Sequence, residues 1–316
     1  MIQAPTSMTR SHINAGLVQA SFSDDREKNW KKLTQQLEQA AEAGTELVVL
    51  PELHNGLYFC QYEDSKEFER AEPIPGPSTE FLSALAKRLQ LVIVGSVFER
   101  RAAGLYHNTA IVLDKDGRLA GRYRKMHIPD DPGYYEKYYF TPGDTGFKPV
   151  HTSIGRIGVL VCWDQWFPEA ARLMTLAGAD ILVYPTAIGW DPVDDESEQQ
   201  RQLDSWIITQ RAHAISNGIP LLAANRHGHE PDPDGRMKGA EFWGNSFICG
   251  PQGEILSQAT ATDDCLLQAN IDLEHNEKIR QTWPFLRDRR IDAYAGIDHR
   301  FLDQASENEI EKNTGE

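Results

Sequence analysis

Residues 12–53 read HINAGLVQASFSDDREKNWKKLTQQLEQAAEAGTELVVLPEL, and this stretch decides the fold class. Its first part, residues 12–21, mixes small and β-branched side chains and predicts a buried strand. Apolar residues then recur with helical spacing over 30–41. Residues 46–53 contain a continuous apolar run and predict a second strand. A strand, a helix and a strand in this order predict a parallel strand pair, because parallel strands need a long crossover connection.

The same alternation continues along the chain. Further helices are expected at 78–88, 168–177 and 203–217. Further strands are expected at 91–98, 107–113, 119–124, 154–162, 181–184, 220–225, 246–249 and 265–271, of which 107–113 and 119–124 form a hairpin. Strands that alternate with both helices and hairpins predict an α/β fold with a mixed sheet. The acidic segment DPVDDESEQQRQ, residues 191–202, lacks apolar periodicity and is expected to be an exposed loop.

The net charge limits the classes of partner. The chain carries 32 Lys and Arg against 47 Asp and Glu, a net charge of −15. Nucleic acids and anionic membrane surfaces both attract clustered cations, so neither is an expected partner. The sequence contains no run of 18 apolar residues, so a membrane span is not expected. Residues 1–10 lack the apolar segment of a secretory signal. Four cysteines without C-x-x-C spacing are expected to be free thiols in a cytoplasmic protein.

Three reactive residues follow apolar runs. Glu52 comes after LVVLP, Lys125 after LAGRYR, and Cys162 after IGVLV. Ligand sites in α/β proteins lie at the carboxyl ends of strands, and a cysteine there, just before a helix, can act as a nucleophile. Taken singly, each residue also fits an ordinary structural role: a surface carboxylate, a solvated ammonium and a small buried thiol.

The flanking residues decide between these readings. The segments LPEL (50–53), YRKMHIP (123–129) and VLVCWDQWFPEAAR (159–172) together resemble the nitrilase, or carbon–nitrogen hydrolase, superfamily. The resemblance implies a four-layer α-β-β-α sandwich over residues 11–295, with an N-terminal extension at 1–10 and a C-terminal tail at 296–316. It also implies a homodimer or larger homo-oligomer, with the helix that opens at Pro168 at the subunit interface.

One branch of this superfamily fits better than the others. The segments DPGYYEKYYFTPGDTGF (131–147), AANRHG (223–228) and FWGNSFI (242–248) resemble the N-carbamoylputrescine amidohydrolase branch. This implies hydrolysis of N-carbamoylputrescine to putrescine, CO2 and ammonia. The chain departs from the branch after Gly189, where it reads WDPVDDESEQQRQLDSW, so recognition of the substrate tail stays open.

The resemblance assigns catalytic roles. Cys162 attacks the carbon of the ureido group, and Glu52 takes the thiol proton and later gives it to ammonia. Lys125, with the backbone N–H of Trp163, stabilises the oxyanion. Glu136 matches the second glutamate of the family and orients Lys125. The chemistry requires no metal or organic cofactor, and HGHE (227–230) is interpreted as a solvated loop rather than a metal site.

The substrate tail leaves several alternatives. An ammonium tail favours a carboxylate, for which Asp191 is the first candidate, with Tyr58, Tyr134 and Trp163 as walls. The neighbouring acids are interpreted as a solvated charge run: Asp194, Asp195, Glu196 and Glu198. A carboxylate tail would instead favour a guanidinium and an N-carbamoyl amino-acid or β-ureido acid amidohydrolase; the candidates are Arg201, Arg211 and Arg226. An aliphatic amidase or nitrilase, and an inactive scaffold, are further alternatives.

Overall fold

The computed structural model describes residues 10–191, 193–232 and 234–302, and it contains two mixed six-stranded sheets. The first sheet has the order β15-β1-β2-β3-β4-β5. Its strands are β15 (Cys265–Asp272), β1 (His12–Gln19), β2 (Leu47–Val49), β3 (Val92–Ala102), β4 (Leu105–Leu113) and β5 (Leu119–Arg124). β1 and β2 pair in parallel, with Leu17 opposite Val49, which confirms the crossover predicted from residues 12–53.

The second sheet has the order β14-β13-β10-β8-β7-β6. Its strands are β14 (Ile255–Gln258), β13 (Phe247–Cys249), β10 (Leu221–Ala224), β8 (Ile181–Pro185), β7 (Gly155–Val159) and β6 (Val150–Thr152). A small three-stranded sheet lies beside them and contains β11 (His227–Glu230), β12 (Ala240–Trp243) and β9 (Gly189–Trp190). The predicted mixed pairing is therefore confirmed in both large sheets, because each contains parallel and antiparallel neighbours.

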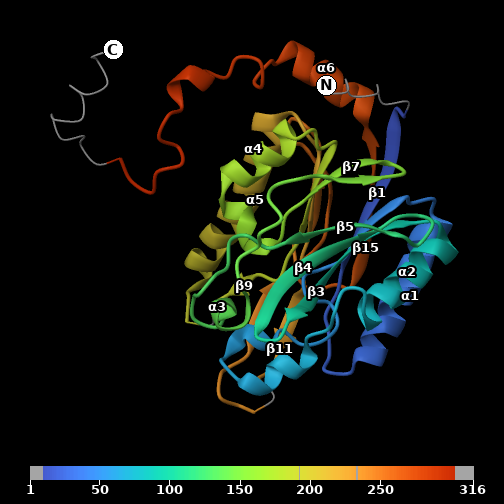
Figure 1. Cartoon of the computed structure of the whole chain (residues 1–316), viewed down its shortest axis with the longest axis vertical. Coiled ribbons are helices and arrows are strands. Elements are labelled where there is room, and N and C mark those ends of the chain that lie inside the picture. Colours follow the sequence, from blue (N-terminus) through green and yellow to red (C-terminus); the bar gives the residue numbers. More distant parts are fainter. Residues whose placement is uncertain (1–9, 192, 233, 303–316) are drawn as a thin grey trace.

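Helices cover the outer faces of the two sheets (Figure 1). α1 (Arg26–Glu42) and α2 (Pro77–Leu89) lie against the first sheet, and α4 (Pro168–Leu176) and α5 (Glu196–Asn217) against the second. α1 begins after Asp25, whose side chain accepts a hydrogen bond from the backbone N–H of Lys28. Two short helices complete the set, α3 (Glu136–Tyr139) and α6 (Leu273–Thr282).

Successive side chains along a strand point to opposite faces of its sheet, and in this way the strands contribute to two apolar clusters. On β1, Ala15 and Leu17 point into a cluster shared with Val159 of β7 and Leu182 of β8, whereas Val18 points into the cluster beneath α1 and α2. Each fully buried Leu or Val contributes on the order of 1.5–3 kcal/mol. One face of each sheet thus packs against the other sheet and the opposite face packs against helices. This arrangement is the expected four-layer α-β-β-α sandwich.

Two local expectations were wrong. Residues 191–202 were expected to form a loop, but α5 already begins at Glu196. The side chain of Asp195 accepts from the backbone N–H of Glu198, and acidic residues in the first turn favour a helix N-terminus even without apolar periodicity. The HGHE segment was expected to be a loop, but it forms β11 and pairs with β12.

The ends of the chain lie largely outside the described residues. This holds for the expected extension at 1–10, apart from Arg10, and for the expected tail beyond residue 302, so both domain boundaries stay predictions. No helix in the described part of the chain combines the length and the apolar character needed to cross a membrane. The four cysteines are free thiols. The cytoplasmic location stays a prediction.

Candidate active site

The structure brings the three residues singled out from the sequence to one end of the sandwich. Glu52 lies in the turn after β2, Lys125 directly follows β5, and Cys162 lies three residues beyond β7. Glu52 and Lys125 have no exposed surface, and Cys162 is 4% exposed. The reactive groups therefore lie just beyond strand ends and are screened from bulk water, which strengthens their electrostatic interactions.

Lys125 joins two carboxylates. Its Nζ donates to Oε1 of Glu52 at 2.8 Å and to Oε2 of Glu136 at 2.6 Å. Burial disfavours the charged ammonium, but the carboxylates of Glu136 and Glu52 outweigh it and raise the pKa of Lys125 well above its usual value. An ammonium has three N–H bonds, and these two acceptors leave one of them for a reacting oxygen.

A close chain crossing fixes the backbone at Lys125. Its N–H donates to the carbonyl of Asn108 at 2.9 Å, and its own carbonyl accepts from the N–H of Gly143 at 2.8 Å. A Cβ at Gly143 would lie 2.0 Å from the carbonyl oxygen of Arg124, so only glycine allows this approach.

Glu52 has one occupied and one free carboxylate oxygen. Oε1 accepts from Lys125 and from the side-chain amide of Asn108, the latter at 2.6 Å. Oε2 is buried and has no hydrogen-bond partner among the described residues. The charge of Glu52 acts on the thiol of Cys162, and a free, desolvated carboxylate oxygen is suited to accept a proton.

Cys162 occupies a strained turn. Its φ is +42°, in the left-handed region that is costly for a non-glycine residue, and it opens a 3₁₀ helix (Cys162–Trp166). Asp164 fixes this turn, because its Oδ2 accepts from the N–H of Val161 at 2.9 Å and its Oδ1 accepts from the N–H of His127 at 3.0 Å. Asp164 thereby connects the cysteine turn to the segment that follows Lys125.

The thiol of Cys162 is not ionised by its surroundings alone. Burial raises its pKa well above the usual value and Glu52 adds to this effect, while Lys125 opposes it. The resting state therefore contains a protonated thiol, and attack on a substrate requires a base to remove the proton.

Glu136 begins α3 and is fully buried. Burial raises its pKa to about 7, although Lys125 opposes this. Its Oε1 accepts from the hydroxyl of Tyr58 at 2.8 Å. Glu136 is thus held between Tyr58 and Lys125, and it also lines the cavity into which Cys162 opens.

That cavity has a volume of about 610 Å³, which suits a small molecule. Its buried reactive side chains, Cys162 and Glu136, define what we call its inner end. Its aromatic and apolar lining residues are Tyr134, Trp163, Trp166, Ala187, Ile188 and Trp243. Its charged lining residues are exposed or half-buried and define what we call its outer end: Asp131, Asp191, Asp194, Glu198 and Arg201. An occupant would therefore place a neutral reacting group inside and a charged tail outside.

The outer end has an excess of carboxylates. Four acidic side chains face one guanidinium, Arg201, whose Nε already donates to Glu198 at 2.9 Å. Gln202 Nε2 donates to Asp194 at 2.6 Å. Asp194 and Glu198, interpreted from the sequence as part of a solvated charge run, thus lie at the cavity because α5 begins early. Asp195 is exposed and caps α5 instead.

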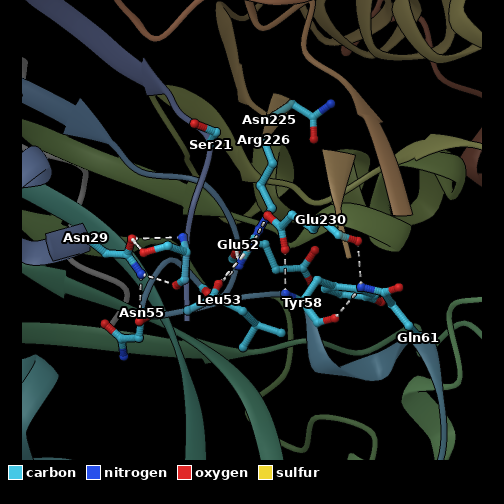
Figure 2. A network of polar contacts seen from close by, with 12 residues as sticks. Ser21, Asn29, Glu52, Leu53, Asn55, Tyr58, Gln61, Asn225, Arg226 and Glu230 are labelled. Atoms are coloured by element: carbon cyan, nitrogen blue, oxygen red, sulfur yellow. Dashed lines mark hydrogen bonds and ion pairs between the residues drawn. The ribbon is translucent and has the colours of Figure 1, made fainter. Parts of the chain in front are cut away.

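Three of the four expected tail-binding residues line the cavity: Tyr134, Trp163 and Asp191. Tyr58 is not among the lining residues, since its ring lies behind Glu136 and its hydroxyl is used there. Of the arginines considered for a carboxylate tail, only Arg201 lines the cavity. Arg211 donates to the carbonyl of Gly253, and Arg226 is fully buried in hydrogen bonds to the Glu52 turn (Figure 2).

Sequence reasoning missed Asn108, Trp166 and Trp243. Asn108 lies in β4 with two other buried polar residues, His107 and Thr109, and this polar stretch before an apolar run was the available signal. The two tryptophans read as ordinary core residues, because nothing in the local sequence distinguishes a core aromatic from a cavity wall.

Comparison with known proteins agrees with this geometry. The carbon–nitrogen hydrolase domain matches residues 14–281. An N-carbamoylputrescine amidase of Solanum lycopersicum is 42% identical over 284 residues, 89% of this chain and 93% of that protein. A citrullinase of Francisella tularensis subsp. tularensis is 40% identical over 288 residues, 91% of this chain and 98% of that protein.

A solved structure is similar over almost the whole chain. The carbon–nitrogen hydrolase of Helicobacter pylori G27 superposes with a TM-score of 0.89 at 51% identity, covering 92% of this chain and 100% of that one. With this overall fold and the match over residues 14–281, the chain belongs to the carbon–nitrogen hydrolase family and is a hydrolase of C–N bonds.

Proposed function

We propose that the protein hydrolyses N-carbamoylputrescine to putrescine, CO2 and ammonia, with Cys162 as the nucleophile. The observation that carries this proposal is the polarity of one cavity. Cys162 and Glu136 lie at its inner end, and four carboxylates lie at its outer end. A neutral ureido group joined by a short apolar chain to an ammonium matches these three zones in order.

The first half-reaction releases ammonia. Oε2 of Glu52 accepts the thiol proton of Cys162, and the sulfur forms a bond to the ureido carbon. Lys125 donates to the resulting oxyanion, assisted by the backbone N–H of Trp163. The terminal C–N bond then breaks, and the nitrogen leaves as ammonia with the proton that Glu52 had accepted. The amine stays attached to Cys162 as a thiocarbamate.

The second half-reaction consumes water. Glu52 accepts a proton from water as its oxygen bonds to the thiocarbamate carbon, and the C–S bond breaks with return of the proton to Cys162. The product is the carbamate of the amine, which loses CO2 in solution. Glu136 orients Lys125 throughout, because it shares the ammonium with Glu52.

The acids of the outer end are the proposed acceptors of the ammonium tail. Asp191 is exposed and its Oδ1 accepts from the N–H of Val193 at 3.0 Å. Asp194 and Glu198 are half-buried and lie on or just before the first turn of α5. Partly desolvated carboxylates bind an ammonium more strongly than exposed ones, so we assign the tail to Asp194 and Glu198 together with Asp191.

A second candidate substrate is an α-amino acid with a ureido side chain, such as citrulline. Arg201 supports it, since a guanidinium at the outer end can bind a carboxylate while the acids bind the ammonium. The Francisella relative is named citrullinase. Arg201 is, however, already paired with Glu198, and a tail carboxylate would have to displace that pair.

The experiment is a panel of ureido substrates that share the reacting group and differ in the tail. N-carbamoylputrescine has a cationic tail, citrulline a zwitterionic one, N-carbamoyl-β-alanine an anionic one, and butylurea a neutral one. The proposal predicts the highest kcat/KM for N-carbamoylputrescine and no ammonia release with Cys162→Ala. A higher kcat/KM for citrulline would establish the second candidate, and a preference for N-carbamoyl-β-alanine would overturn both.

We also propose that two copies pair through α4 and α5. Apolar side chains are exposed along these neighbouring helices: Leu173 (45%), Leu176 (48%), Ile208 (60%) and Ile215 (41%). Water contact with such a patch is unfavourable, and a second copy would cover it. Sedimentation of the full chain is expected to give a dimer or a multiple of it, and Ile208→Glu is expected to shift it toward the monomer. A monomeric parent protein would contradict this.

A further inference from the structure

We propose that Arg226 is a positioning residue that holds both carboxylates of the site, Glu52 directly and Glu136 through Glu230 and Tyr58. This inference rests on the catalytic roles proposed above for Cys162 and Glu52. Arg226 follows β10, carries no exposed surface, and is not among the residues that line the cavity. It would therefore act only through the residues that it holds.

The guanidinium of Arg226 donates hydrogen bonds to the turn that carries Glu52 (Figure 2). Its Nε and Nη2 donate to the carbonyl of Glu52 at 3.0 and 2.9 Å, and Nη2 also donates to the carbonyl of Leu53. Its Nη1 donates to the carbonyl of Gly56 at 2.9 Å. One side chain thus binds three backbone carbonyls on both sides of the bend.

The turn depends on these bonds. Leu53 has a φ of +49°, which is unfavourable for a leucine, and residues 50–54 are buried outside any helix or strand. Buried carbonyls without a sheet or helix partner must be paired by side chains. A guanidinium supplies five N–H groups in a fixed plane, whereas a lysine supplies a single charged point that cannot reach three carbonyls at once.

The hydrogen bonds from Arg226 to the Glu52 turn form one chain of contacts, here called the first arm. A second chain of contacts, here called the second arm, connects Arg226 to Glu136. Nη1 forms an ion pair with Oε1 of Glu230 at 2.7 Å, and Oε2 of Glu230 accepts from the backbone N–H of Tyr58 at 2.6 Å. The hydroxyl of Tyr58 donates to Glu136 at 2.8 Å. All of these groups are buried, so the chain of contacts is protected from exchange with water.

The two arms meet at Lys125. Glu52 and Glu136 are held from behind by Arg226 and Tyr58, and they hold the ammonium between them. The rings of Phe22 and Phe242 lie 4.8 and 5.7 Å from the guanidinium carbon and restrict its movement. A loosened Arg226 would shift Oε2 of Glu52 relative to the thiol without altering the cavity that binds the tail.

The test is Arg226→Lys in the full chain, with Arg280→Lys as the matched control. Arg280 also donates to a backbone carbonyl, that of Gly218 at 2.9 Å, but lies on α6 away from the site. We expect Arg226→Lys to lower kcat for N-carbamoylputrescine about 10- to 100-fold, with KM changed less than about threefold. The control is expected to retain the kcat of the parent protein.

A second readout is the rate at which iodoacetamide alkylates Cys162, which requires no substrate. Arg226→Lys is expected to slow it by about the same factor as kcat, because proton removal by Glu52 is impaired. If the parent protein turns over no ureido compound, the proposed substrate fails while this readout still tests Arg226. Unchanged alkylation and unchanged kcat in folded Arg226→Lys would overturn the inference.

Glu230→Gln keeps the test informative if Arg226→Lys does not fold. It removes the ion pair and the charged acceptor of the Tyr58 N–H but leaves the carbonyl contacts of Arg226. A decrease of kcat by about tenfold at nearly constant KM is expected. A folded Glu230→Gln variant with parental kcat and parental alkylation rate would contradict the second arm.

Discussion

The ammonium of Lys125 lies 2.8 Å from Oε1 of Glu52, and Oε2 of the same carboxylate has no hydrogen-bond partner among the described residues. One oxygen is thus fixed by a cation and the other is free to exchange a proton. Because the pKa of Cys162 is raised by burial, the thiol requires a base, and we propose that this free oxygen is that base.

Replacing Glu52 by Gln is expected to lower kcat by about 10²- to 10⁴-fold, since the amide cannot accept the thiol proton. Ammonia release under saturating substrate measures this. Glu72→Gln is the matched control, because Glu72 is also a buried carboxylate but binds the N–H of Ser78 outside the site. Equal activity of Glu52→Gln and the parent would remove Glu52 from the mechanism.

The acid side of the pH–activity profile is expected to reflect Glu136. Burial raises its pKa to about 7, so Glu136 is charged above that pH and becomes protonated below it. Loss of its charge weakens its hold on Lys125, and kcat/KM should fall as the pH decreases through about 7. In Glu136→Gln this limb should disappear, with lower activity at every pH.

Tyr58→Phe is expected to lower kcat about tenfold and the free energy of unfolding by about 1–3 kcal/mol. The substitution removes only the hydroxyl that donates to Glu136 and leaves a buried carboxylate oxygen without that donor. The ring contact with Phe242, at a centroid distance of 5.7 Å, is retained. Circular dichroism melting checks the stability and steady-state kinetics check kcat. An increase in KM alone would show that Tyr58 acts on the tail instead.

The outer acids are expected to act on affinity for the tail. Asp194→Asn combined with Glu198→Gln should raise KM for N-carbamoylputrescine about tenfold and leave KM for butylurea unchanged. Arg201→Gln should leave KM for N-carbamoylputrescine unchanged. If citrulline is the substrate, the same substitution should raise KM for citrulline. An equal effect of the acid substitutions on both ureas would mean that these acids do not contact the ammonium.

His54 is expected to make folding sensitive to acid. It is fully buried, neither ring nitrogen has a partner among the described residues, and burial, with a contribution from Arg226, lowers its pKa to about 3. In the unfolded chain His54 binds a proton near pH 6.5, whereas in the folded chain it does so only near pH 3. The free energy of unfolding therefore decreases as the pH decreases from about 6.5 toward 3.

His54→Leu removes this titration. Urea unfolding between pH 6.5 and 4.5 is expected to show a smaller decrease of the free energy of unfolding in the variant, by up to about 1.4 kcal/mol per pH unit, which corresponds to one proton per molecule. Identical pH slopes for variant and parent would mean that His54 is protonated in the folded state.

The alternation of strands and helices predicted the α/β fold with mixed sheets, because such patterns are local. The four layers, and the choice of Glu52, Lys125 and Cys162 as reactive residues, were implied by the resemblance of the flanking segments to a known family. Apolar runs marked β2, β5 and β7, and Glu52, Lys125 and Cys162 follow them. The partners of these residues were harder to predict. Asn108 and Arg226 reach Glu52 from positions distant in the chain, and the choice of such a partner is decided only by tertiary packing.

The outer end of the cavity was mispredicted for a different reason. The first two turns of α5 are polar all round, so residues 196–202 give no amphipathic signal. Capping by Asp195 is the physical cause of the early helix, and a serine–aspartate–glutamate-rich segment is compatible with both a loop and a helix start. Tyr58 was assigned to the wall because an aromatic ring near a predicted site suits either a wall or a support.

The central claim is that Cys162 attacks the ureido carbon and that ammonia leaves first. Intact mass and peptide mapping of acid-quenched protein, mixed with N-carbamoylputrescine and taken before steady state, test it most directly. We predict an adduct on Cys162 equal in mass to the substrate minus ammonia, which forms more slowly in Glu52→Gln because the thiol then lacks its base. A bare carbamoyl group on Cys162, or turnover that persists in Cys162→Ala without any adduct, would contradict it.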